Sequence, residues 1–171
     1  MKCVTSGSAY TDIDALACAI GYAELCGCDA VLPGKFNSTI PQCVQDFGFK
    51  YLTGFRKDYD SFVIVDMSDP RYLPDCVSVD KVEMVFDHHL GFADFWQEKC
   101  QIESIGACAT MIFELFKDVK PSVKTANLLY TAIFANTLNF KAKVTTDRDL
   151  RAAEKLKNFI NLPTDEQLFD N

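Results

Sequence analysis

Short apolar runs that alternate with helix-like stretches constrain this chain more than any other feature. Short runs bounded by polar or turn residues are typical of buried strands. The apolar ones are Ala30–Leu32, Phe62–Val65 and Val82–Phe86, and Lys2–Ser6 is short and extended. Apolar strands separated by helices favour a parallel sheet that is covered on both faces. The sequence therefore predicts a three-layer α/β/α fold with a mainly parallel sheet.

Helical periodicity fills the intervals between these runs and most of the second half of the chain. It predicts a helix over Asp14–Cys26 and a shorter one over Thr39–Phe47, with Pro41 in its first turn. Three further apolar faces are carried by Ile105, Ala109, Ile112, Phe113 and Phe116, by Leu129 and Ile133, and by Leu150, Ala153, Leu156 and Ile160. We expect one domain over residues 1–161 and a polar tail or truncated linker over 162–171.

Composition restricts the class of protein. The chain has 171 residues, of which 49% are hydrophobic, and a net charge of −7, as in a globular domain with an acidic surface. An acidic surface argues against non-specific nucleic-acid binding. No apolar stretch reaches the length of a membrane span and no leader opens the chain, so we expect a soluble cytoplasmic protein. The eight cysteines form no C-x-x-C pair, and we expect small buried thiols such as Cys18 and Cys108.

Polar side chains with metal-ligating atoms follow several of the predicted elements. They are Asp12, Asp14, Asp66, Asp87, His88 and His89 after strands, and Asn136 after a helix-like run. Sites in open parallel sheets form beyond the carboxyl ends of the strands, so we expect these side chains to converge. Crowded carboxylates repel one another unless a cation or protons neutralise them. Oxygen and imidazole ligands favour Mn²⁺, Mg²⁺ or Co²⁺, and the sequence predicts one or two such ions.

Each of these residues also has a purely structural interpretation. Thr11 or Asp12 is a natural N-cap for the helix that follows. Asp66 alone is compatible with a turn before Ser68-Asp69-Pro70, and a lone histidine after a strand is more often a surface or capping residue than a ligand. The joint placement of these residues is what favours a metal site.

Four segments resemble the motifs of the DHH phosphoesterase family, from about residue 3 to about residue 160. They read TDIDALACAIGYAEL, FVIVDMSDP, FDHHLGF and AIFANTLNFKAKVTTDRD. That family includes the manganese-dependent (family II) inorganic pyrophosphatases, exopolyphosphatases, nanoRNases and RecJ exonucleases. The resemblance implies a metal-dependent phosphohydrolase that acts on pyrophosphate, short polyphosphate or a small phosphodiester.

The resemblance also implies metal ligands, because family members use two divalent ions. Asp12 would bind the first ion and Asp14 the second, with Asp66 bridging both. His88 would bind the second ion, and Asn136 stands at the position of a further ligand to it. Such a pair of ions would activate a water and offset charge on the phosphoryl oxygens.

Further residues would act on the substrate. His89 would face the phosphate, and Asp87 would orient its neighbours without touching the metal. Lys141, Lys143 and Arg148 follow the fourth motif and are candidates for anchoring phosphate. The alternative for these three is that they are solvated charges in a loop and at a helix start.

The motifs depart from the family pattern at both ends. Pyrophosphatases and nanoRNases carry a histidine where this chain has Ser8, and RecJ-like members carry an aspartate where it has Tyr10. Asn136 stands in place of an aspartate, so its amide oxygen is a neutral ligand. The second domain that closes over the cleft in the family would begin about where this chain stops, at Asn171. We expect weaker water exclusion and substrate clamping without it.

Two alternatives to an active hydrolase stay open. One is a catalytically degenerate domain that binds metal and a phosphate ligand as a sensor or partner subunit, which Ser8, Asn136 and the absent lid favour. The other is a half-enzyme that pairs with another chain or with itself, as a homo-oligomer, to complete its site.

Overall fold

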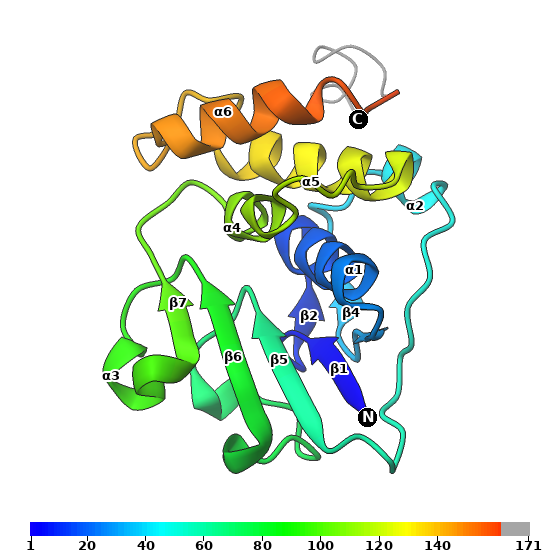
Figure 1. Cartoon of the computed structure of the whole chain (residues 1–171), viewed down its shortest axis with the longest axis vertical. Helices are drawn as coiled ribbons and strands as arrows, with labels where there is room; N and C mark the ends of the chain where they lie inside the picture. The colour runs from blue at the N-terminus through cyan, green and yellow to red at the C-terminus, as the bar shows by residue number, and fades with distance from the viewer. Residues whose placement is uncertain (162–171) are drawn as a thin grey trace.

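A five-stranded parallel sheet forms the centre of the computed structural model, which describes residues 1–161 (Figure 1). Its strands are β1 (Lys2–Thr5), β3 (Asp29–Val31), β5 (Ser61–Val65), β6 (Val82–Asp87) and β7 (Cys100–Ile102). Their order is β3-β1-β5-β6-β7, and every neighbouring pair is parallel. The predicted parallel sheet is confirmed, whereas the predicted tail at 162–171 lies outside the described residues.

Four helices cover one face of this sheet (Figure 1). They are α1 (Ile13–Cys26), α4 (Cys108–Leu115), α5 (Val123–Asn136) and α6 (Asp147–Leu156). Helix α1 packs on the sheet and against α4 and α5, and α6 packs on α4 and α5. Val63 and Phe86 of the strands are buried in one core with Leu16 and Ile133 of the helices. Cys18 and Cys108 are fully buried, as predicted.

Shorter elements cover the opposite face. They are α3 (Ala93–Trp96) and the 3₁₀ turns η1 (Pro70–Tyr72), η2 (Val79–Lys81) and η3 (Gln97–Lys99). Side chains alternate along a strand, so Phe62 and Ile64 of β5 enter a second core with Trp96, while Val63 and Val65 enter the first. Burial on both faces explains the uninterrupted apolar run of β5, and helices on both sides confirm the predicted layers.

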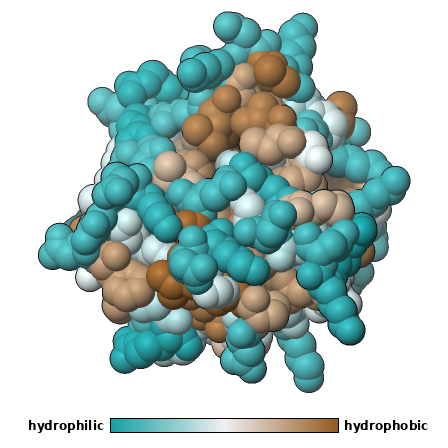
Figure 2. All heavy atoms as spheres, turned by 60° about the horizontal axis from the view of Figure 1, so that its bottom comes forward, coloured by the Kyte–Doolittle hydropathy of each residue, from teal (hydrophilic) through white to brown (hydrophobic). Residues whose placement is uncertain are grey.

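The surface is mostly polar on the side that Figure 2 presents, with apolar side chains gathered in a few separate patches. The two cores account for much of the apolar composition. Within residues 1–161, no helix has the length and apolarity that a membrane span needs.

One predicted helix is shorter than expected. Helix α2 covers Gln42–Gln45, not Thr39–Phe47. Thr39 is held outside it, because its N–H and its hydroxyl both donate to Asn37 Oδ1, at 2.9 and 2.6 Å. The same hydroxyl accepts the N–H of Ile13 at 3.0 Å. Thr39 therefore braces the start of α1 instead of starting α2.

A small parallel pair, β2 (Tyr10–Thr11) and β4 (Lys35–Phe36), leads the chain into α1. Gly34 lies against β2, and a Cβ added there would come within 2.6 Å of the backbone carbon of Tyr10. We expect Gly34→Ala to lower the free energy of unfolding by about 1–3 kcal/mol, since overpacking against backbone has few ways to relax. Urea denaturation measures this change.

Gly54→Ala is the matched control for this prediction. A Cβ at Gly54 meets nothing within 4 Å, so its effect is expected to stay within about 0.5 kcal/mol. Equal stability of the two variants would show that the β2 backbone yields to Gly34→Ala without strain.

Candidate metal centre

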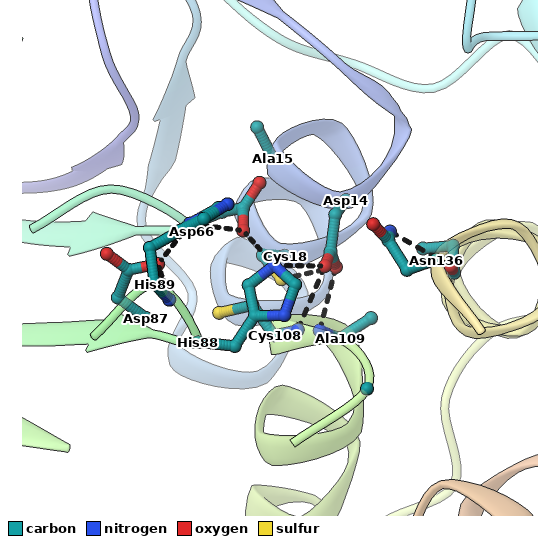
Figure 3. Close-up of polar contacts among 12 residues, drawn as sticks. Asp14, Ala15, Cys18, Asp66, Asp87, His88, His89, Cys108, Ala109 and Asn136 are labelled. Atoms are coloured by element: carbon teal, nitrogen blue, oxygen red, sulfur yellow. Dashed lines mark hydrogen bonds and ion pairs between the residues drawn. The ribbon is translucent and has the colours of Figure 1, made fainter. Parts of the chain in front are cut away.

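The candidate site lies where α1 begins and where β5 and β6 end (Figure 3). Asp14 is in the first turn of α1, and Asp66 directly follows β5. His88 and His89 follow Asp87, the last residue of β6. Parallel strands end at the same edge of a sheet, which is why residues so distant in the sequence meet here.

Asp66 occupies the middle of the group. Its backbone N–H donates to the Phe86 carbonyl at 2.8 Å, and its φ of 54° lies in the left-handed region that non-glycine residues rarely adopt. The carboxylate is buried, and Oδ1 has no hydrogen-bond partner among the described residues. Burial, followed by the charges of Asp14, Asp12 and Asp87, raises the pKa of Asp66 well above its usual range.

The partners of the two histidines indicate where each ring carries its proton. His88 Nδ1 lies 3.2 Å from the Ile105 carbonyl, which can only accept, so we assign the hydrogen to Nδ1. His89 Nδ1 lies 2.8 Å from Asp87 Oδ1 and is assigned in the same way. Nε2 is then the free ligand atom of each ring. His88 Nε2 faces two carboxylates, at 3.4 Å from Asp66 Oδ1 and 3.6 Å from Asp14 Oδ2.

Asp87 holds the neighbouring ring in place. Its Oδ1 also accepts the backbone N–H of His89 at 3.0 Å. Burial acts to raise the pKa of Asp87, but the hydrogen bonds from His89, together with a contribution from Ser68, outweigh it, and the pKa lies below its usual range. Asp87 is therefore charged at neutral pH and holds the His89 ring by its contact with Nδ1, while its role in a catalytic site stays a prediction.

Asp14 is tied to a second helix. Its Oδ2 accepts the N–H of Cys108 at 2.9 Å, and its Oδ1 accepts the N–H of Ala109 at 2.8 Å (Figure 3). These are the first two residues of α4, whose own N-cap, Ala107, has no side-chain hydrogen-bond acceptor. Asp14 thus caps α4 from α1, and burial raises its pKa. No local sequence pattern shows this contact, because its partners are more than 90 positions away.

Three residues at the ends of the motifs form hydrogen bonds with groups outside the centre. They are Asp12, Ser8 and Asn136. Asp12 is the N-cap of α1, and its Oδ1 accepts the Ala15 N–H at 2.9 Å, which confirms the capping interpretation. Ser8 donates its N–H to the Tyr72 carbonyl at 3.2 Å. Asn136 ends α5 with its amide directed toward Asp14, and its Nδ2 donates to the carbonyl of Ala132, one turn earlier, at 3.1 Å (Figure 3).

An open cleft of about 290 Å³ lies beside the centre. Its lining residues are Ser6, Gly7, Ala9, Tyr10, Asp12, Ala15, Asp66, Met67, Tyr72 and His89. The three basic residues predicted to anchor phosphate are not among them. Lys141 and Lys143 are exposed, and Arg148 is paired with Glu103 and with Glu114, the latter at 2.6 Å. Their predicted role in substrate binding stays a prediction.

Sequence reasoning missed Asp149, a fully buried carboxylate in α6. It accepts hydrogen bonds from the N–H of Gly106 at 3.0 Å, the hydroxyl of Thr110 at 2.6 Å, and both the N–H and the hydroxyl of Thr146 at 2.7 Å. It therefore fixes the loop before α4, whose Ile105 carbonyl orients His88. Thr146 and Asp149 form a capping box, and their three-residue spacing is the signal that was available.

Comparison with known proteins agrees with this architecture. Relatives assigned as manganese-dependent inorganic pyrophosphatases include one from Lactobacillus acidophilus, 28% identical over 162 residues, covering 88% of this chain and 52% of the relative. Another, from Lactiplantibacillus plantarum, is 29% identical over 169 residues and covers 91% and 54%. The chain thus spans about half the length of the curated relatives it matches.

Two solved structures also have folds similar to that of this chain. A Methanococcus jannaschii protein assigned to the family II inorganic pyrophosphatases superposes with a TM-score of 0.81 at 25% identity, covering 99% of this chain and 60% of that one. An exopolyphosphatase-related protein from Bacteroides fragilis, at 13% identity and a TM-score of 0.73, covers 98% and 54% and shows the fold alone. The model of the DHH family, N-terminal domain, matches residues 2–133. Since that match covers most of the chain, the protein belongs to the DHH family.

Proposed function

We propose that this chain carries a divalent-metal-dependent phosphohydrolase site that acts on pyrophosphate, short polyphosphate or a small phosphodiester. The observation that carries the proposal is Asp66 Oδ1, a buried carboxylate oxygen without a hydrogen bond, 3.4 Å from His88 Nε2. Burying an ionised carboxylate is costly unless a counter-charge compensates it. Carboxylate oxygens beside free imidazole nitrogens fit a divalent cation.

The proposed cation is Mn²⁺, with Mg²⁺ or Co²⁺ as substitutes. The names of the pyrophosphatase relatives support manganese. Asp66 and His88 would hold it at the centre, with Asp12, Asp14 and Asn136 as the other predicted ligands. When bound, a divalent cation offsets charge on phosphoryl oxygens and makes a coordinated water more acidic.

The rest of the site supports a phosphate ester or anhydride as substrate. His89 has a side chain that is 65% exposed and lines the cleft, so its ring is accessible to a small ligand. Asp87 fixes the orientation of that ring. The cleft volume of about 290 Å³ admits a small phosphorylated molecule. Asp12 and Asp66 on its wall would repel an anion unless the cation offsets their charge.

A second candidate function is a degenerate domain that binds metal and a phosphate ligand without efficient turnover. It is favoured by the lining of the cleft, which holds no lysine or arginine among the described residues. Phosphoryl transfer depends strongly on positive groups around the transferred phosphate. A homo-oligomer and a cytoplasmic location stay predictions.

Phosphate release from pyrophosphate, tripolyphosphate and bis(p-nitrophenyl) phosphate tests the proposal, with the purified chain in Mn²⁺ or in EDTA. We expect turnover of at least one substrate in Mn²⁺ and none in EDTA. His88→Ala should lose that turnover, whereas Arg56→Ala, in an exposed ion pair with Asp58, should keep it. Mn²⁺ binding without turnover would support the degenerate domain, and the absence of both would refute a metal site.

A further inference from the structure

We infer that this chain binds one divalent cation rather than two, through Asp66, His88 and His89, so that His89 is a metal ligand. The inference rests on the proposed function and narrows it. The ligand atoms of these three side chains all lie within 4.8 Å of one another, and within residues 1–161 no other set of three such residues does so. Two imidazoles and one carboxylate form a set that leaves positions open for water and substrate.

His89 has the features of a ligand in addition to its position. Its Nδ1 is engaged by Asp87 at 2.8 Å, which leaves Nε2 free and makes the ring a stronger donor to a cation. The His88 and His89 rings lie edge to face with centroids 4.4 Å apart. His88 Nε2 lies 3.4 Å, and His89 Nδ1 4.0 Å, from the oxygen of Asp66 that lacks a hydrogen bond.

A second ion on the Asp12 side of Asp66 would find few donors. One oxygen of Asp12 already caps α1 through the N–H of Ala15. Ser8, at the position where the pyrophosphatases carry a histidine, bonds through its N–H to the Tyr72 carbonyl. The cleft lining supplies no nitrogen ligand there other than His89 itself. On the Asp12 side of Asp66, a second ion would therefore find only carboxylate oxygens as side-chain ligands.

The Asp14 side is satisfied without a second ion. Both oxygens of Asp14 accept N–H groups at the start of α4, and a helix N-terminus offsets negative charge. Asn136 is neutral and already bonded through its Nδ2 to Ala132. Asp87 accepts both hydrogen bonds from His89 through Oδ1, and its Oδ2 has no partner among the described residues. Asp66 is therefore the carboxylate at this centre that has both an oxygen without a hydrogen bond and an imidazole nitrogen free to share a cation with it, His88 Nε2.

Metal counting tests the inference directly. Metal-free protein would be titrated with Mn²⁺ by calorimetry, and the bound metal measured by elemental analysis after gel filtration. We expect one ion per chain and the six-line electron paramagnetic resonance spectrum of an isolated Mn²⁺. Two ions with an exchange-coupled spectrum would overturn the inference and leave the proposed function intact. No bound ion would refute the proposed function itself.

The role of His89 is tested by substitution. We expect His89→Ala to weaken Mn²⁺ binding by more than about 10-fold, because losing even a group that only supports a ligand costs 10-fold to 100-fold. Leu90→Ala, at the exposed residue that follows His89 and lies outside the cleft lining, is the control and should bind Mn²⁺ as the unaltered chain does. The exposed ring makes a folding defect improbable in His89→Ala, and equal unfolding temperatures in EDTA would check this. Unchanged Mn²⁺ affinity would show that His89 contacts only the substrate.

Discussion

Replacing Asp66 with alanine is expected to abolish measurable Mn²⁺ binding and to reduce phosphate release by more than about 100-fold. Losing a residue that merely supports a metal ligand costs about 10-fold to 100-fold, and Asp66 supplies the central carboxylate. Its Oδ1 is buried, has no hydrogen bond and lies beside both histidines. Calorimetric titration with Mn²⁺ and the phosphate-release assay measure the two effects.

The same substitution separates a lost ligand from a damaged fold. Asp66 is buried near Asp12, Asp14 and Asp87, and its pKa is raised, so in the absence of metal its charge opposes folding. We therefore expect Asp66→Ala to unfold in EDTA at a temperature no lower than the unaltered chain does. Asp75→Ala, at an exposed aspartate, is the matched control and should bind Mn²⁺ normally. Activity above half of the unaltered value in Asp66→Ala would exclude a metal role for this carboxylate.

Metal removal is expected to lower the unfolding temperature, and to lower it more at pH 7 than at pH 5. Binding at a free Mn²⁺ concentration of 100 times the dissociation constant stabilises the folded state by about 2.7 kcal/mol. For a chain of this size that corresponds to roughly 5–10 °C. Differential scanning calorimetry in Mn²⁺ and in EDTA measures the difference.

The pH dependence follows from the raised pKa values of Asp14 and Asp66. Above the unfolded value of about 4, the metal-free folded state holds more protons than the unfolded state. Its stability is therefore greatest in acid and falls as the pH rises through the folded pKa values. Mn²⁺ binds the deprotonated carboxylates, so its contribution grows over the same range. The lowered pKa of Asp87 has the opposite sign, but it acts below about pH 4.

Asp66→Asn is the control for this experiment, because it keeps the shape of the side chain and removes its charge. We expect it to flatten the pH dependence of the metal-free protein and to show no Mn²⁺ shift. An EDTA effect of equal size at pH 5 and pH 7 would contradict the assignment of Asp66 as the titrating ligand.

Much of the fold was predictable because its main strands are buried on both faces. Phe62–Val65 is apolar throughout, and Val82–Phe86 is apolar except for the exposed Glu83, so both strands are visible in the sequence. Strand β7 could not be predicted from the sequence. Its three residues, Cys100–Ile102, are half-buried at a sheet edge, and the strand depends on its pairing with β6. The pair β2 and β4 has two residues in each strand, too few to form a periodic pattern.

The site was predictable to the extent that its residues follow strands. Asp66 and His88 lie where the ends of β5 and β6 place them, and the adjacent His89 comes with them. The contacts of Asp14 with Cys108 and of Asp149 with Gly106 join positions that are far apart in the chain. Only packing of the helices creates these contacts, so local spacing could not reveal them.

The hydrogen bonds that Asp149 accepts limit how far this domain can be shortened from its C-terminal side. The match to the DHH family model ends at residue 133. A chain that ended there would lack α6, and with it the Asp149 carboxylate that accepts hydrogen bonds from Gly106 and Thr110. The Ile105 carbonyl would then be free to turn, and His88 would lose the group that aims its ring. The smallest module that keeps these hydrogen bonds therefore extends through Leu156, well past the end of the family-model match.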